Sequence, residues 1–256
     1  MDFRERLKKV NEVLKGSGYS EQKEIIKNLF EKTDGNKKED ISLRLVVIDS
    51  YYSTNMSKRK FWIEDLSKLI LEIKGQLTDE IDVMQFVKRN FDKIMLDIGI
   101  DKKGNPLGHA LSLITKYIYY QTKFNFPIYD SLVKDGLIDE GLISKTFSIK
   151  YFEKLSEIKN KYKISYDDLD KYFWVIGKIK SGNLSLLISD SKIYINDFIK
   201  NLNLTEVEKK YTSNEFDDLV SKKLVSDGVS FQDEKLSLIK ELAISINNDG
   251  RVINMK

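Results

Sequence analysis

The side chains that could carry out chemistry in this chain are of few types. Cysteine is absent and there is one histidine, His109. Zinc sites normally take several Cys or His ligands, so we expect no metal and no cofactor. A nucleophile activated by histidine would have to use His109 or do without one. Any catalysis is therefore expected to rest on carboxylates, lysines, tyrosines or hydroxyls.

Four polar side chains recur at helical spacing near the middle of the chain. His109, Ser112, Lys116 and Tyr120 fall on one side of a predicted helix, opposite its apolar residues. One interpretation is a polar wall that faces Asp130. The other is the solvated face of an amphipathic helix, which surface helices normally show. The pattern favours this second interpretation.

The elements that would position these side chains are predicted to be helices. Apolar residues repeat at helical spacing in Trp62–Ile73 and again in the segment that follows Gly108. The second stripe consists of Ala110, Leu113, Ile114, Tyr117 and Ile118. The chain has two prolines, so few breaks are obligatory. Alternation typical of strands is hard to find outside short pieces such as Asn183–Ile188. The sequence predicts an all-α fold.

Polar and glycine-containing segments separate the predicted helices. Breaks are expected at Thr33–Asp40, Gly75–Asp82 and Asp101–Gly108. The last of these lies between a helix over Asp82–Asp97 and the helix over His109–Tyr120. We expect one helical domain over residues 1–180 and a C-terminal helical extension over residues 181–256.

The order of segments after residue 82 resembles the helix–hairpin–helix DNA glycosylase superfamily. The helix His109–Tyr120 is followed by an extended connection, Tyr120–Pro127, and then by Phe126–Ser131 (FPIYDS). The resemblance covers about Ile41 to Lys178. Within it, Leu43–Asn55 is similar to an early helix of the family, and Asp168–Lys178 to its closing aromatic helix.

The resemblance implies a two-lobed helical fold with a cleft between the lobes. In that family the hairpin amides grip a DNA phosphate, and an aspartate lies at the mouth of the base pocket. Asp130 is the residue that matches this catalytic position. It also precedes Ser131-Leu132-Val133, where an aspartate is a natural N-cap. The two roles are compatible.

The hairpin departs from the family pattern. Gly99 and Gly108 stand nine positions apart, whereas the family's two glycines are two residues apart. Bifunctional members carry a nucleophilic lysine at the start of the second hairpin helix, and Leu107–Leu111 contains none. The resemblance therefore implies, at most, a monofunctional DNA N-glycosylase in which a carboxylate stabilises positive charge on the sugar and orients water.

Residues that match the DNA-facing parts of the family are candidate contacts to DNA. Aromatic and amide side chains can stack on an extruded base or fill its gap, and basic or polar ones can contact phosphate. Each also has a structural interpretation as a core aromatic, a soluble turn or a helix start. The candidates are Tyr51, Tyr52, Asn55, Lys58, Arg59, Lys60, Lys102, Lys103, Gly108, His109, Ser112 and Lys116.

Charge and hydropathy restrict the cellular setting. The net charge is +3, from 43 basic and 40 acidic residues, a weaker bias than many DNA-binding domains show. No stretch approaches about 18 consecutive apolar residues, and the N-terminus lacks the pattern of a signal peptide. We expect a cytoplasmic protein with DNA as its partner and no membrane contact. The alternative is a non-catalytic helical scaffold that binds protein partners or DNA, with a role in defence against mobile elements as a third hypothesis.

Overall fold

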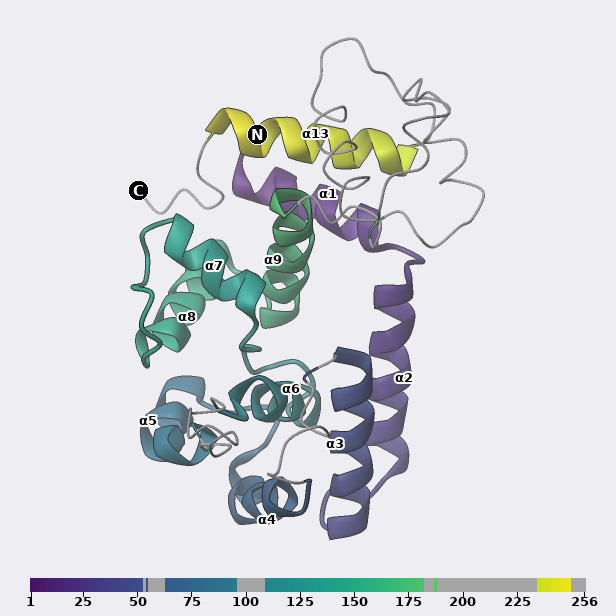
Figure 1. The fold of residues 1–256 in the computed structure, drawn as a ribbon, viewed down its shortest axis with the longest axis vertical. Helices are drawn as coiled ribbons and strands as arrows, with labels where there is room; N and C mark the ends of the chain where they lie inside the picture. The colour runs from purple at the N-terminus through teal and green to yellow at the C-terminus, as the bar shows by residue number, and fades with distance from the viewer. Residues whose placement is uncertain (53, 55–62, 96–108, 182–186, 188–233, 250–256) are drawn as a thin grey trace, which may run out of the picture. The chain divides into compact units, whose positions relative to one another are not determined.

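The structure is a computed structural model, and it describes residues 1–52, 54, 63–95, 109–181, 187 and 234–249. These residues form α-helices and one short 3-10 helix, and they contain no β-strand (Figure 1). The all-α prediction is confirmed. The helices are α1 (Phe3–Leu14), α2 (Gly18–Lys32), α3 (Lys38–Tyr52), α4 (Ile63–Ile73), α5 (Val83–Ile94), α6 (Leu111–Gln121), α7 (Ser131–Asp139), α8 (Lys150–Tyr162), α9 (Tyr166–Lys180) and α13 (Glu234–Asp249), with the 3-10 helix η2 at Lys74–Gln76.

The helices belong to two compact units. The first comprises Met1–Ser20, Asp135–Leu142 and Lys171–Lys256, and the second Glu21–Lys134 and Ile143–Asp170. These units do not follow the division at residue 180 expected from the sequence. The reason lies in the first unit, where the N-terminal helix α1 packs against α13.

The first unit is held by contacts between residues far apart in the sequence. The buried Arg6 of α1 donates from Nε to Oγ of Ser245 at 2.9 Å and from Nη2 to the carbonyl of Ser245 at 3.2 Å. In the same unit, a Cβ added at Gly136 would lie 2.6 Å from the ring of Phe173. Trp174 is half-buried and packs against Tyr19, with ring centroids 4.8 Å apart.

The second unit is built around α6. Helix α3 packs against α4 and α6, and α5 packs against α6 and α8. The predicted apolar stripes are buried: Leu66, Leu69, Ile70 and Ile73 on α4, and Ala110, Leu113, Ile114, Tyr117 and Ile118 on or beside α6. Every residue of α6 from Leu113 to Tyr120 is buried. A helix covered on all sides is a core helix rather than an amphipathic surface one.

The connection after α6 differs from the extended segment predicted for Tyr120–Pro127. The helix ends in a turn in which Lys123 (φ 46°) and Phe124 (φ 71°) are left-handed. The amide of Phe124 donates to the carbonyl of Tyr119 at 2.7 Å, which satisfies one of the last carbonyls of the helix. Irregular backbone begins only after this turn and leads to Asp130.

Candidate functional site

The segment before α7 is fixed to its neighbours by two hydrogen bonds. The amide of Tyr129 donates to Oγ1 of Thr115 on α6 at 2.9 Å. The hydroxyl of Tyr151, on α8, donates to the carbonyl of Ile128 at 2.7 Å. The bond from Tyr151 is buried and the bond from Tyr129 is part-buried. They fix the backbone from which the side chain of Asp130 extends.

Asp130 is the N-cap of α7. Its Oδ1 accepts a hydrogen bond from the amide of Leu132 at 2.8 Å, and its carbonyl accepts one from the amide of Lys134 at 3.0 Å. The capping role predicted from the sequence is therefore confirmed. The other carboxylate oxygen, Oδ2, lies 3.8 Å from Nζ of Lys116. The side chain of Asp130 is 29% exposed, so the carboxylate is accessible while it caps the helix.

Lys116 places a cation inside the second unit. Its side chain is 3% exposed, and Nζ donates to Oγ of Ser112 at 2.7 Å. Nζ also lies 4.9 Å from the ring centroid of Tyr52, a cation–π geometry. Burial lowers the pKa of Lys116, while the negative charges of Asp130 and Asp170 act in the opposite direction. At 3.8 Å the contact with Asp130 is an ion pair rather than a hydrogen bond.

The polar stripe of α6 is not the solvated face that the sequence pattern favoured. Lys116 and Tyr120 are buried and Ser112 is half-buried, whereas His109, which precedes the helix, is exposed. That interpretation is wrong for Lys116 and Tyr120 because neighbouring helices cover α6. Within this stripe, Lys116 is the residue that the structure places beside Asp130.

Tyr52, whose ring lies beside Lys116, forms a hydrogen-bonded pair with Tyr120 of the same stripe. The hydroxyl of Tyr52, on α3, lies 2.8 Å from the hydroxyl of Tyr120, on α6. Burial raises the pKa of each hydroxyl, so both keep their protons at neutral pH. The neighbouring Tyr51 is 38% exposed and stands outside this group.

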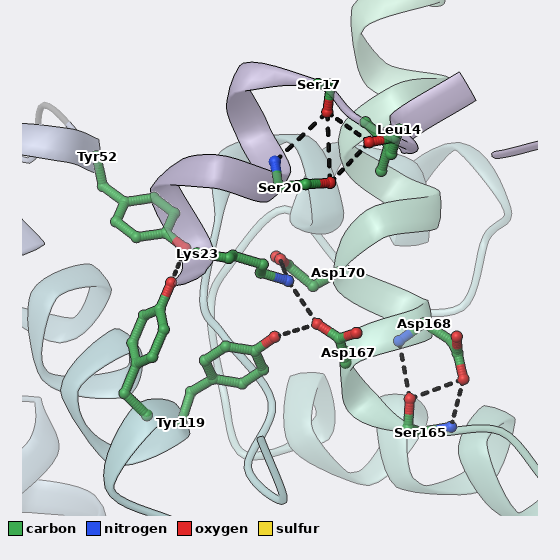
Figure 2. Close-up of polar contacts among 11 residues, drawn as sticks. Leu14, Ser17, Ser20, Lys23, Tyr52, Tyr119, Ser165, Asp167, Asp168 and Asp170 are labelled. Carbon is green, nitrogen blue, oxygen red and sulfur yellow. Dashed lines mark hydrogen bonds and ion pairs between the residues drawn. The ribbon is translucent and has the colours of Figure 1, made fainter. Parts of the chain in front are cut away.

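A second buried cluster was not identified from the sequence. Lys23 on α2 contacts Oδ1 of Asp167 at 2.5 Å and Oδ2 of Asp170 at 3.1 Å, and the hydroxyl of Tyr119 donates to Asp167 (Figure 2). The side chains of Lys23 and Asp170 are 8% and 9% exposed. Asp170 acts electrostatically on Lys116 and on Tyr52 as well. The negative charge of Asp170 therefore acts on both clusters.

One local signal could have indicated this cluster. Lys23 stands three positions before Ile26 and seven before Phe30, on the side of α2 that faces the core. A lysine on an apolar stripe indicates a buried partner, because an unpaired buried charge is costly. Its partners could not be found, since they lie 144 and 147 residues away. A third aspartate at the start of α9, Asp168, has a local role instead. It forms a reciprocal capping box with Ser165 (Figure 2).

The remaining candidate contacts to DNA lie outside the described residues. They are Asn55, Lys58, Arg59, Lys60, Lys102, Lys103 and Gly108. Among the residues that are described, no group of three or more His, Asp or Glu side chains could hold a metal ion. No helix in the described part of the chain is long and apolar enough to cross a membrane.

Removing the charge of Lys116 is expected to change how stability depends on pH. Because its pKa is lowered in the folded state, the unfolded chain binds more protons between that value and 10.5. Lys116 therefore makes the free energy of unfolding rise with pH across this window. In Lys116→Met this contribution is lost, so the wild type should gain stability over the variant as pH approaches 10.5.

Urea unfolding at a series of pH values measures this difference. The matched control is Lys93→Met, at a lysine whose side chain is 48% exposed and pairs with Glu72 on the surface. Its profile should run parallel to that of the wild type. Parallel profiles for Lys116→Met as well would show that Lys116 is not the buried cation that the structure describes.

Comparison with known proteins supplies no function. No protein-family model matches the chain, and no solved structure matches it. An uncharacterised protein of Haemophilus influenzae is 28% identical over 136 residues. The match covers 51% of this chain and 62% of that protein, so the chain spans less than two thirds of its relative.

Proposed function

We propose that this chain binds DNA and releases a base by hydrolysis of the N-glycosidic bond, with Asp130 as the catalytic carboxylate. The proposal includes the two-lobed arrangement of helix–hairpin–helix glycosylases, which the sequence resembles. The observation that supports it best is the setting of Asp130. One carboxylate oxygen is held by the amide of Leu132, while the other lies beside the buried ammonium of Lys116.

This setting suits a carboxylate that must keep its position and its charge. As the bond from C1′ to the base nitrogen breaks, the nitrogen takes the electron pair and positive charge develops on the sugar. A carboxylate near C1′ stabilises that charge, orients the water that forms the new C1′–O bond, and accepts the proton that this water loses. Lys116 and the cap would hold the carboxylate in one orientation, and preorganised charge is an effective source of catalysis.

The assay is base release by the wild type from a panel of damaged and mismatched duplexes. We expect release without strand cleavage, because Lys116 is buried and engaged with Ser112 and Asp130. Affinity for duplex DNA should fall steeply with salt, and replacing both Lys102 and Lys103 by alanine should flatten that slope. A covalent intermediate trapped by borohydride would contradict hydrolysis, and Lys116 would then be the first lysine to test as the nucleophile.

A specific observation favours a second candidate, a non-catalytic scaffold. On α3, Leu43 and Val46 are 46% and 50% exposed, and Tyr51 on the same helix is also exposed. Exposed apolar side chains that cluster on one helix are typical of protein-binding surfaces. Absence of base release and of DNA binding at low salt would favour this candidate.

A further inference from the structure

Unlike Lys23 and Lys116, the buried Arg44 in the second unit forms no ion pair with a carboxylate of the described residues. Arg44 on α3 is 2% exposed. Its five N–H groups donate to neutral oxygens at 2.6–3.3 Å: the hydroxyls of Thr33 and Tyr117, the side-chain oxygen of Gln121, and the carbonyls of Phe30 and Thr33. No carboxylate of the described residues forms an ion pair with it.

The surroundings of Arg44 offset its charge only in part. The carbonyls of Phe30 and Thr33 belong to the C-terminal end of α2, which carries a partial negative charge. Asp34 acts on the guanidinium through space, and its carboxylate is engaged by the amide and side chain of Asn36 at 2.9 Å. A buried cation that lacks a full countercharge is electrostatically suited to an anion beside it.

A cavity of about 220 Å³ is lined by two of the side chains that contact this guanidinium, while Arg44 itself lies behind its wall. Tyr117 and Gln121, which accept from Nη1 of Arg44 at 3.3 and 2.8 Å, both line it. Gly35 lines it as well, and a Cβ at this position would lie 2.9 Å from Nη1 of Arg44. The rest of the lining includes Lys74 and Asn36, with Ile70 and Leu77 as apolar walls.

Three side chains of this lining have N–H or O–H groups that no acceptor of the described residues uses. Tyr117 is fully buried, burial raises its pKa, and its own O–H has no acceptor among the described residues. A guanidinium can only donate, so Gln121 must turn Oε1 toward Arg44, which leaves its amide N–H groups for another acceptor. Lys74 uses one N–H on Oδ1 of Asn36 at 3.0 Å. The hydrogen bonds from Arg44 also polarise Tyr117 and Gln121 and so strengthen them as donors.

We infer that this cavity binds an oxyanion of the phosphate class, held by Tyr117, Gln121 and Lys74 with Arg44 behind them. The inference is independent of the proposed function, since none of these residues contacts Asp130 or Lys116 in the described hydrogen bonds and ion pairs. The phosphate group could be free inorganic phosphate or part of a nucleic-acid backbone. Both sources present the same oxygens to the site.

The test is thermal unfolding with inorganic phosphate against chloride at constant ionic strength. A ligand that binds the folded state raises the unfolding temperature, so the wild type should be stabilised by phosphate beyond the effect of chloride. Gln121→Glu would place a carboxylate against Arg44, which balances its charge internally and repels the anion. This variant should fold without phosphate and lose the phosphate response.

Two milder variants measure the donors separately. Tyr117→Phe removes one O–H, and its phosphate affinity should fall about tenfold, the equivalent of one charge-assisted hydrogen bond. Lys74→Gln should also weaken phosphate binding, whereas Lys93→Gln, with the same change of charge at another exposed lysine, should not. The inference is refuted if phosphate stabilises the wild type no more than chloride, or if Gln121→Glu responds as the wild type does.

Duplex binding distinguishes the two sources. If the phosphate group belongs to DNA, Gln121→Glu should weaken duplex binding by a factor similar to its loss of phosphate affinity. If the source is the free anion, duplex binding should be unchanged while the phosphate response is lost. Base release assigned to Asp130 is measured separately, so either proposal can fail without the other.

Discussion

Asp130→Asn is expected to abolish base release while leaving the protein folded and able to bind DNA. Asparagine is about as good an N-cap as aspartate, and its Oδ1 can still accept from the amide of Leu132. What disappears is the negative charge that the proposed mechanism requires. We expect a loss of activity of at least about 100-fold, the lower range for a positioned acid–base group. Affinity for DNA could rise, because a negative charge near phosphates is removed.

The structure adds a modest expected cost in stability to this variant. Lys116 loses the ion pair at 3.8 Å but keeps Ser112 as acceptor and Tyr52 as a cation–π partner. Because the side chain of Asp130 is 29% exposed, water screens this ion pair. The free energy of unfolding should therefore fall by no more than about 1 kcal/mol, as it does for exposed ion pairs. Asp130→Ala should cost about 0.5–2 kcal/mol more, since the cap is lost too.

The matched control for charge is Asp139→Asn. Asp139 is the last residue of the same helix, its side chain is 53% exposed, and it pairs with Lys180 at 2.8 Å on the surface. This variant should release bases as the wild type does. Equal activity of wild type and Asp130→Asn would refute the catalytic assignment, and inactivity of the wild type across the whole panel would leave capping as the only role the structure supports.

Removing Lys23 is expected to cause a larger loss of stability than removing any of the exposed, ion-paired lysines that the structure describes. Lys23→Met leaves Asp167 and Asp170 facing one another without their shared cation. Breaking a buried ion pair by removing one partner typically costs about 3–5 kcal/mol. Asp167 is 21% exposed and keeps the hydroxyl of Tyr119 as a donor, so we expect a loss at the lower end of that range, about 3 kcal/mol. Urea unfolding at neutral pH should show this as a lower midpoint with an unchanged slope.

A lysine one turn further along α2 is the control. Lys27 pairs with Glu24 at 3.5 Å, and the two side chains are 42% and 64% exposed. Lys27→Met should cost no more than about 0.5 kcal/mol, as exposed helix pairs do. Adding Asp167→Asn and Asp170→Asn to Lys23→Met should restore most of the lost stability. Similar small effects at Lys23 and Lys27 would show that the buried cluster does not join α2 to the start of α9.

The sequence alone determined the local features of this protein. Helices α4, α5 and α6 begin and end near the predicted positions, because apolar spacing, caps and glycine-rich breaks act within a few residues. The N-cap role of Asp130 followed for the same reason: its hydrogen-bond partner, Leu132, is two residues away.

Only the tertiary structure decided which polar residues are buried together. The stripe of α6 looked solvated because its pattern shows which side is apolar and cannot show whether other helices cover the polar side. Burial of Lys116 follows from the packing of α3 and α5 around α6. Lys23 forms an ion pair with Asp170, which lies 147 residues later in the sequence, and Arg6 donates a hydrogen bond to Ser245, 239 residues later. Ion pairs and hydrogen bonds at such separations leave no periodic trace in the sequence, because their partners are brought together by the packing of whole helices.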